Sequence, residues 1–207
     1  MINKISTQAL FACAAVLALS MAPATTQAAD IAQLTKTCAG CHGADGASTH
    51  GTVPTIGGMS SAYIADTLGK YKSGDRKNCE AVKSSSGESS DMCKVAKDLS
   101  GDDMKALGDF FVGKKFVHAK QGTDAALAKK GKDIAEQTCE KCHTDGGGVA
   151  ADDSGILSGQ WKQYLKKEIT DFRSGNRTAA KKMAPKIEKL EQSDIDALVE
   201  YFGSGQK

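Results

Sequence analysis

Two short cysteine–histidine motifs are the residues of this chain whose spacing could do chemistry. Each has two cysteines separated by two residues and a histidine directly after the second: Cys38, Cys41 and His42, then Cys139, Cys142 and His143. On a helical turn this spacing brings both sulfurs to one face, where each can form a thioether with a vinyl group of haem. The histidine then projects toward the iron as its proximal ligand. The motifs therefore predict two covalently bound haem c groups.

Other uses of paired cysteines fit this chain less well. A structural zinc site needs four ligands, and once Cys13 is set aside only Cys79 and Cys93 remain outside the motifs, both in the first half. A thioredoxin-like dithiol needs a βαβ setting, which the helical pattern of the chain lacks. We therefore favour haem attachment over a zinc site, a redox dithiol or a disulfide within each motif.

An internal repeat indicates one distal iron ligand for each motif. The second motif follows the first at an offset of 101, and the same offset places Tyr71–Arg76 onto Phe172–Arg177. Further on the offset falls to 91 and pairs Met92 with Met183. Methionine opposite histidine raises the potential of a haem and favours electron transfer. We expect these two methionines as distal ligands, against the plainer interpretation that each fills core space.

Several other candidate ligands have no counterpart in the repeat. We expect the following to lie in the core, on the surface or in ordinary hydrogen bonds: Met59, Met104, His50 and His118. Cys93 is a rival ligand beside Met92, and it would lower the potential and suit catalysis. An oxidising compartment permits a Cys79–Cys93 disulfide instead, which is our expectation.

The carbonyl of Pro54 could accept the second N–H of the first proximal histidine. The residue equivalent to Pro54 in the second half is Gly155, so the two haem pockets should differ.

The rest of the pattern is helical. Apolar residues recur every three or four positions in Ser61–Tyr71 and after the capping positions Ser100 and Ser193, and no convincing alternating strand occurs. The fall in offset means that the first half has ten additional residues before Met92, rich in serine and glycine, which predict a loop. We predict an all-α chain of two tandem, duplicated domains, residues 30–113 and 123–207, joined by a linker at 114–122.

The N-terminus predicts export to the periplasm. Lys4 is followed by an apolar run over 9–21 and small residues up to Ala29, which together predict a signal peptide at 1–29. The run is too short for a permanent membrane anchor, and because it continues beyond Cys13 we do not favour a lipid anchor there. A formal charge of +2 gives no electrostatic footprint for nucleic acid. We expect no nucleic-acid partner and no membrane span in the mature chain.

The arrangement resembles a known family. Each half is similar to a class I cytochrome c domain, and the whole resembles the dihaem cytochrome c subunit of flavocytochrome c sulfide dehydrogenase. The second half carries the more specific likeness, in its motif and the segments Gly146-Gly147, Ile156–Trp161, Asp171–Arg173 and Lys181–Ala184. The resemblance implies that the motif cysteines bind haem and that the iron ligands are His42 with Met92 and His143 with Met183.

The resemblance also implies partners. In that family an FAD-containing flavoprotein subunit oxidises sulfide, and the cytochrome subunit passes the electrons to a soluble acceptor such as a small cytochrome c without being catalytic itself. Two alternatives stay open: a free-standing periplasmic dihaem carrier serving a terminal oxidase, and a dihaem enzyme that oxidises thiosulfate at a haem with a cysteine ligand. The insertion with Cys79 and Cys93 departs from the family and affects the surroundings of the first haem.

Overall fold

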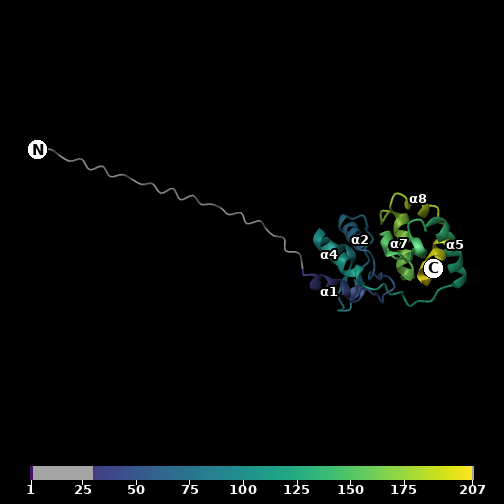
Figure 1. Cartoon of the computed structure of the whole chain (residues 1–207), viewed down its shortest axis with the longest axis horizontal. Helices are drawn as coiled ribbons and strands as arrows, with labels where there is room; N and C mark the ends of the chain where they lie inside the picture. The colour runs from purple at the N-terminus through teal and green to yellow at the C-terminus, as the bar shows by residue number, and fades with distance from the viewer. Residues whose placement is uncertain (2–29, 207) are drawn as a thin grey trace.

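The computed structural model describes Met1 and residues 30–206, so the expected signal peptide lies almost wholly outside the described residues. Figure 1 shows two helical lobes joined by an extended segment. The first lobe contains α1 (Ile31–His42), α2 (Ser61–Ser73), β1 (Val82–Lys83), β2 (Ser89–Ser90), α3 (Met92–Lys97) and α4 (Gly101–Val112). The second contains α5 (Ala125–Thr138), α6 (Thr144–Gly147), the 3-10 turn η1 (Ala150–Asp152), α7 (Lys162–Ser174), α8 (Ala184–Ile187) and α9 (Gln192–Ser204). The predicted all-α architecture of two tandem domains is confirmed, apart from the short hairpin of β1 and β2.

Local capping signals explain where the longer helices start and stop. The Ser60 side chain accepts from the main chain of α2, and Gly74 ends that helix in the left-handed region at φ +83°. Ser100 and Asp103 form a reciprocal capping box at the start of α4, where the sequence predicted it. Helix α9 begins at Gln192, because Glu191 and Asp194 form its capping box. Its capping residue is therefore two positions earlier than the predicted Ser193.

Each lobe has its own apolar core. The first is built from α2 and α4, with Ile64, Leu68, Leu107 and Phe111 among its buried members. The second is built from α5, α7 and α9, with Leu165, Ile195, Leu198 and Phe202. Helices α5 and α9 approach so closely that a Cβ on Gly131 would overlap the Ala197 carbonyl, so only glycine fits at this crossing.

The ten-residue insertion is a small hairpin rather than a plain loop. Val82 pairs with Ser90 and Lys83 with Ser89 in an antiparallel register. Two-residue strands are too short for alternation to show in the sequence, which is why no strand was predicted. The hairpin lies against the first motif, because the Ser85 N–H donates to the Gly40 carbonyl at 2.8 Å.

The two lobes meet at equivalent residues of the repeat. Arg76 and Arg177 form an antiparallel bridge. The Lys77 N–H donates to the Asn176 carbonyl and the Thr178 N–H donates to the Asp75 carbonyl, each at 2.8 Å. The offset of 101 converts one of these bonds into the other, so the lobes face each other across an approximate two-fold axis.

Among the described residues no helix combines the length and the apolar character that crossing a membrane requires.

Candidate haem-binding sites

The first motif lies on the last turns of α1. The Asp30 side chain caps this helix by accepting from the Ala32 N–H at 3.0 Å. Cys38 and Cys41 lie three residues apart on the helix, so their sulfurs share a face, and His42 is its last residue. All three side chains line one cavity. The helical presentation expected for the first motif is therefore present.

That cavity suits a flat apolar cofactor. Its volume of ≈ 380 Å³ lies in the range of roughly 300–1,000 Å³ typical of cofactor sites. Its walls come from α1, α2 and α4 and include Leu34, Ile64, Leu68, Leu107 and Phe111. Met92 lines the same cavity, so the structure gathers all four first-half residues of the predicted site. Met59 lines it too and is 2% exposed.

The histidine of the first motif is held in the tautomer that a metal ligand needs. His42 Nδ1 lies 2.8 Å from the Pro54 carbonyl oxygen, which can only accept, so Nδ1 carries the proton. Nε2 is thereby left as the nitrogen for iron. Burial lowers the pKa of His42, which favours the neutral ring that binds metals. The expected contact with Pro54 is confirmed.

The motif thiols are not built as a redox dithiol. Burial raises the pKa of Cys38 to about 11 and that of Cys139 to about 11 as well. Reactive dithiols need the opposite shift, because the thiolate is the attacking species. An apolar cavity, a Cys38 thiol with a raised pKa and an adjacent imidazole with one free nitrogen fit covalent haem binding better than thiol–disulfide exchange.

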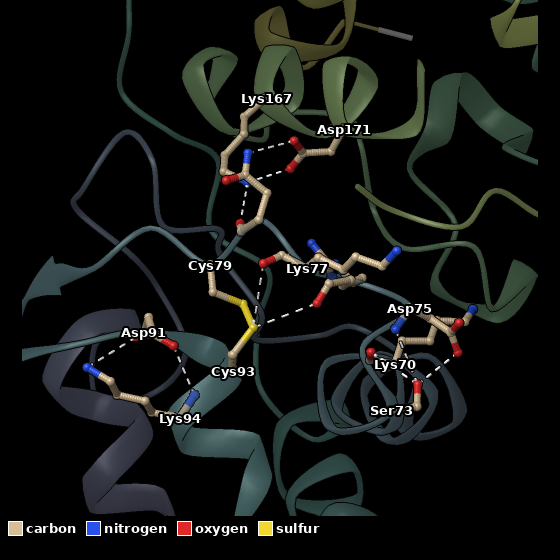
Figure 2. The surroundings of a disulfide bond; sticks show 12 residues. Lys70, Ser73, Asp75, Lys77, Cys79, Asp91, Cys93, Lys94, Lys167 and Asp171 are labelled. Carbon is tan, nitrogen blue, oxygen red and sulfur yellow. Dashed lines mark hydrogen bonds and ion pairs between the residues drawn. A yellow bond between two sulfur atoms is a disulfide. The ribbon is translucent and has the colours of Figure 1, made fainter. Parts of the chain in front are cut away.

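Met92 is the first residue of α3. The Asp91 side chain caps this helix by accepting from the Lys94 N–H at 2.9 Å. The next residue, Cys93, is joined to Cys79 in a disulfide (Figure 2). Its sulfur is therefore not free to compete with Met92 for a metal. Met104, another methionine left without a role, is packed in the first core.

The second motif has a different local structure. Helix α5 ends at Thr138, so Cys139, Cys142 and His143 lie in the turns between α5 and α6. The chain turns there partly because the Asp152 carboxylate accepts from the N–H and the hydroxyl of Thr144, at 2.8 and 2.7 Å. The equivalent of Thr144 in the first half is a glycine, and so is that of Asp152, so the first motif has no such side-chain contact.

The second half also contains a smaller cavity. A cavity of ≈ 260 Å³ in the second half is lined by Lys132, Glu136, Glu140, Asp145, Gly146 and Tyr201, with none of the predicted ligands. Met183 directly precedes the short helix α8, and its side chain makes no capping hydrogen bond. His143 Nδ1 is buried without a hydrogen-bond partner, since the equivalent of Pro54 is Gly155, which lies against the Tyr63 ring of the first half. The expected difference between the two pockets is therefore present: Nδ1 is hydrogen-bonded in His42 and has no hydrogen-bond partner in His143.

A charged cluster that the sequence analysis did not single out borders the first cavity. Glu168 of α7 accepts from Arg76 at 2.6 Å and from Arg177 at 2.5 Å, and the glutamate is almost fully buried. Each guanidinium also lies 4.2 Å from the centroid of an aromatic ring, Arg76 over Tyr71 and Arg177 over Phe172. Two cations against one anion favour a cofactor with carboxylate groups. The repeated aromatic–arginine spacing was the signal that could have found this cluster.

Two further residues contribute to the contact between the lobes. Trp161 Nε1 donates to the Ser48 carbonyl at 3.1 Å, which places this tryptophan at the domain interface. Gln160, fully buried, accepts from the Thr55 N–H and donates to the Thr55 carbonyl, both at 2.9 Å. These bonds hold the loop beside Pro54, and hence the carbonyl that orients His42.

Comparison with known proteins assigns each half to a cytochrome. Residues 28–112 match the family model described as cytochrome c, and residues 126–202 match that of cytochrome c oxidase, cbb3-type, subunit III. Cytochrome c4 of Pseudomonas aeruginosa is 31% identical over 176 residues, which cover 80% of this chain and 82% of that protein. The solved structure of Acidithiobacillus ferrooxidans cytochrome c4 superposes with a TM-score of 0.68 at 27% identity, covering 82% of this chain and 99% of that one. The cytochrome subunit of sulfide dehydrogenase from Chlorobaculum tepidum is 33% identical over 78 residues, 38% of this chain and 60% of that subunit.

Proposed function

The chain belongs to the cytochrome c4 family, whose members have two cytochrome c domains with two covalently bound haem c groups, and from this premise we propose that it is a free-standing periplasmic electron carrier serving a terminal oxidase. The observation that carries the proposal is the extent of the similarity. The likeness to cytochrome c4 spans four fifths of both chains, whereas the likeness to a sulfide dehydrogenase subunit spans 38% of this one.

We assign the haem ligands as the repeat predicts them. Cys38 and Cys41 hold the first haem and Cys139 and Cys142 the second, with His42 and His143 as proximal and Met92 and Met183 as distal ligands. In the first half this assignment is supported by the shared cavity and by the orientation of His42. In the second half it is supported by the offsets of the repeat. The bound haem supplies a reversible one-electron couple at iron.

The ligand set explains why the chain would carry electrons rather than transform a substrate. A histidine and a methionine at each haem would leave no iron position free for a substrate, and the neutral methionine sulfur would raise the potential. Burial of His42 at 7% exposure and the apolar walls of its cavity exclude water from the proximal side. The disulfide at Cys93 removes the thiol that a cysteine-ligated thiosulfate enzyme would need.

The domain contact supports electron exchange between the two halves of one molecule. Tyr164, Lys167 and Glu168 of α7 line the first-half cavity, so the second domain forms part of the first haem's surroundings. A periplasmic location agrees with the disulfide, which persists in oxidising compartments, and with the expected signal peptide.

The proposal is tested with the exported, haem-loaded full chain. We expect a mass that includes two haems, no flavin after purification, and cyanide-sensitive re-oxidation of the reduced protein by membranes that contain a terminal oxidase. Carbonic anhydrase, which contains no haem, serves as the control for non-specific colour changes. A protein that stays reduced with active membranes would contradict the carrier role.

A second candidate is the cytochrome subunit of a flavocytochrome c sulfide dehydrogenase, which the 78-residue likeness and the second-half segments favour. This role predicts that the chain elutes together with an FAD-containing flavoprotein and that sulfide reduces its haems only when that flavoprotein is present. Independent elution and equal haem reduction with and without the flavoprotein would exclude it. Haem reduction by thiosulfate alone, with turnover, would instead support the enzyme alternative.

A further inference from the structure

The segment before the hairpin is fixed to the second domain. The Lys77 N–H donates to the Asn176 carbonyl at 2.8 Å. Asn78 is held twice by α7: its side-chain amide donates to Asp171 at 2.8 Å, and its carbonyl accepts from Lys167 Nζ at 2.9 Å. Figure 2 shows Lys167 and Asp171 on their helix directly above this segment. Cys79 therefore follows a residue whose position the second domain determines.

The disulfide transfers this anchoring to the first-half cavity. Cys79 is bonded to Cys93, which is the neighbour of Met92 on the first turn of α3. Both Cys79 and Met92 line the cavity that contains the first motif. The Cys93 sulfur also lies 3.7 Å from the carbonyl oxygen of Arg76, the residue whose main chain bridges to the second lobe. A short covalent path thus runs from the domain interface to the candidate distal ligand.

The second half needs no such device. Met183 comes six positions after Arg177, whereas Met92 comes sixteen positions after Arg76 because of the insertion. A longer connection leaves the ligand more conformations to lose on binding iron. A cross-link removes many of those conformations. The disulfide therefore restricts the longer connection in front of Met92, which would otherwise weaken the binding of this methionine to iron.

We propose that Cys79 and Cys93 are positioning residues for the distal ligand of the first haem, and that they couple Met92 to helix α7 of the second domain. The inference rests on the proposed role of Met92 as an iron ligand. Breaking the disulfide, or freeing Asn78 from α7, weakens the Met92–iron bond and leaves the Met183–iron bond unchanged. The tuning of the first haem thus depends on an intact domain interface.

The test measures the strength of each methionine–iron bond in the ferric holoprotein. The near-infrared sulfur-to-iron band is followed during an alkaline titration, and its loss reports displacement of methionine. In C79S/C93S we expect the half of the band that belongs to the first haem to disappear at a pH about one unit lower than in the wild type. This shift corresponds to a roughly tenfold weaker methionine–iron bond. We also expect one of the two haem potentials to fall. Asn78→Ala should also lower the pH at which this half of the band disappears, but by a smaller amount.

The controls separate positioning from simple stabilisation. Ser86→Ala changes the hairpin without touching the disulfide or α7 and should leave both halves of the titration unchanged. If C79S/C93S does not load two haems, the wild-type holoprotein is treated with a phosphine instead. The disulfide oxidises the phosphine to its oxide, and water supplies the oxygen of the oxide and the protons of the two thiols. The proposal would be overturned if the titration midpoints of the band and the two haem potentials were the same with the disulfide intact and broken, even if the melting temperature fell.

A separate variant distinguishes this inference from the carrier function. Met92→Ala should remove the half of the band that C79S/C93S shifts. If it removes none, Met92 is not a ligand and the positioning role falls, while oxidation by oxidase-containing membranes still decides the carrier role. If the membranes fail to oxidise the protein, the band titration still decides the positioning role.

Discussion

The main chains of Arg76 and Arg177 pair with each other in an antiparallel bridge where the two lobes meet. These residues are equivalent in the repeat, so the duplicated segments contact each other at the same position from both sides. Their guanidinium groups share one carboxylate, that of Glu168. The equivalent of Glu168 in the first half is Thr67, so a nearly symmetric backbone contact carries an asymmetric charge cluster.

Glu168→Gln should destabilise the protein strongly. The change leaves two guanidinium groups of low exposure without their carboxylate, and breaking a buried ion pair in this way costs about 3–5 kcal/mol. Urea unfolding of the holoprotein, followed by circular dichroism, measures the loss. Asp66→Asn is the control, because its ion pair with Lys70 is exposed and should be worth only about 0.3–0.5 kcal/mol. Equal effects of the two variants would show that the cluster contributes little.

Gln160→Leu should weaken the coupling between the lobes. The variant removes both hydrogen bonds to the Thr55 main chain, and a buried unsatisfied group costs about 1–3 kcal/mol. We expect a lower unfolding midpoint and two resolved transitions instead of one. Gln192→Leu, which removes an exposed side-chain bond to Asp196, should leave the transition intact. An unaltered single transition in Gln160→Leu would contradict a structural role for this amide.

Met183→Ala should leave both haems attached and open one iron to external ligands. The thioethers and His143 stay in place, whereas the distal position loses its sulfur. Carbon monoxide binding to the reduced protein and cyanide binding to the oxidised protein, each at one haem per chain, are the measurements. Met104→Ala is the control: it should cost about 2–5 kcal/mol of stability as a core truncation without opening an iron. An unchanged spectrum with no ligand binding in Met183→Ala would refute the assignment.

Alkaline pH should destabilise the fold partly through Tyr71. Burial raises the pKa of this phenol to about 12, above the value of about 10 for an exposed tyrosine. Because the folded-state pKa is the higher one, the contribution of Tyr71 is complete below about pH 10 and is lost as pH rises toward the folded value. The slope of unfolding free energy against pH in that window should be shallower in Tyr71→Phe than in wild type. Parallel slopes would exclude this linkage.

The haem chemistry and the helical scaffold could be predicted from the sequence because both depend on short-range patterns. The spacing of Cys38, Cys41 and His42 is read within one helical turn, and the capping box at Ser100 within four residues. The repeat nominated Met92 as a ligand, and the structure brings it to the cavity of the first motif. The redox partner could not be predicted as well from the sequence. The family resemblance suggested a sulfide dehydrogenase subunit, whereas the broader likeness to cytochrome c4 favours a free carrier.

The arrangement between the lobes was decided only by the tertiary structure. Glu168 meets Arg76 across 92 positions of the chain and Gln160 meets Thr55 across 105, and no local pattern specifies such pairs. The turn conformation around His143 likewise depends on Asp152, and the His143 ring lacks the carbonyl partner that Pro54 gives His42. The sequence by itself therefore determined which groups bind haem, because local spacing sets that chemistry. The packing of the two halves decided what surrounds each haem, because that depends on residues brought together from distant parts of the chain.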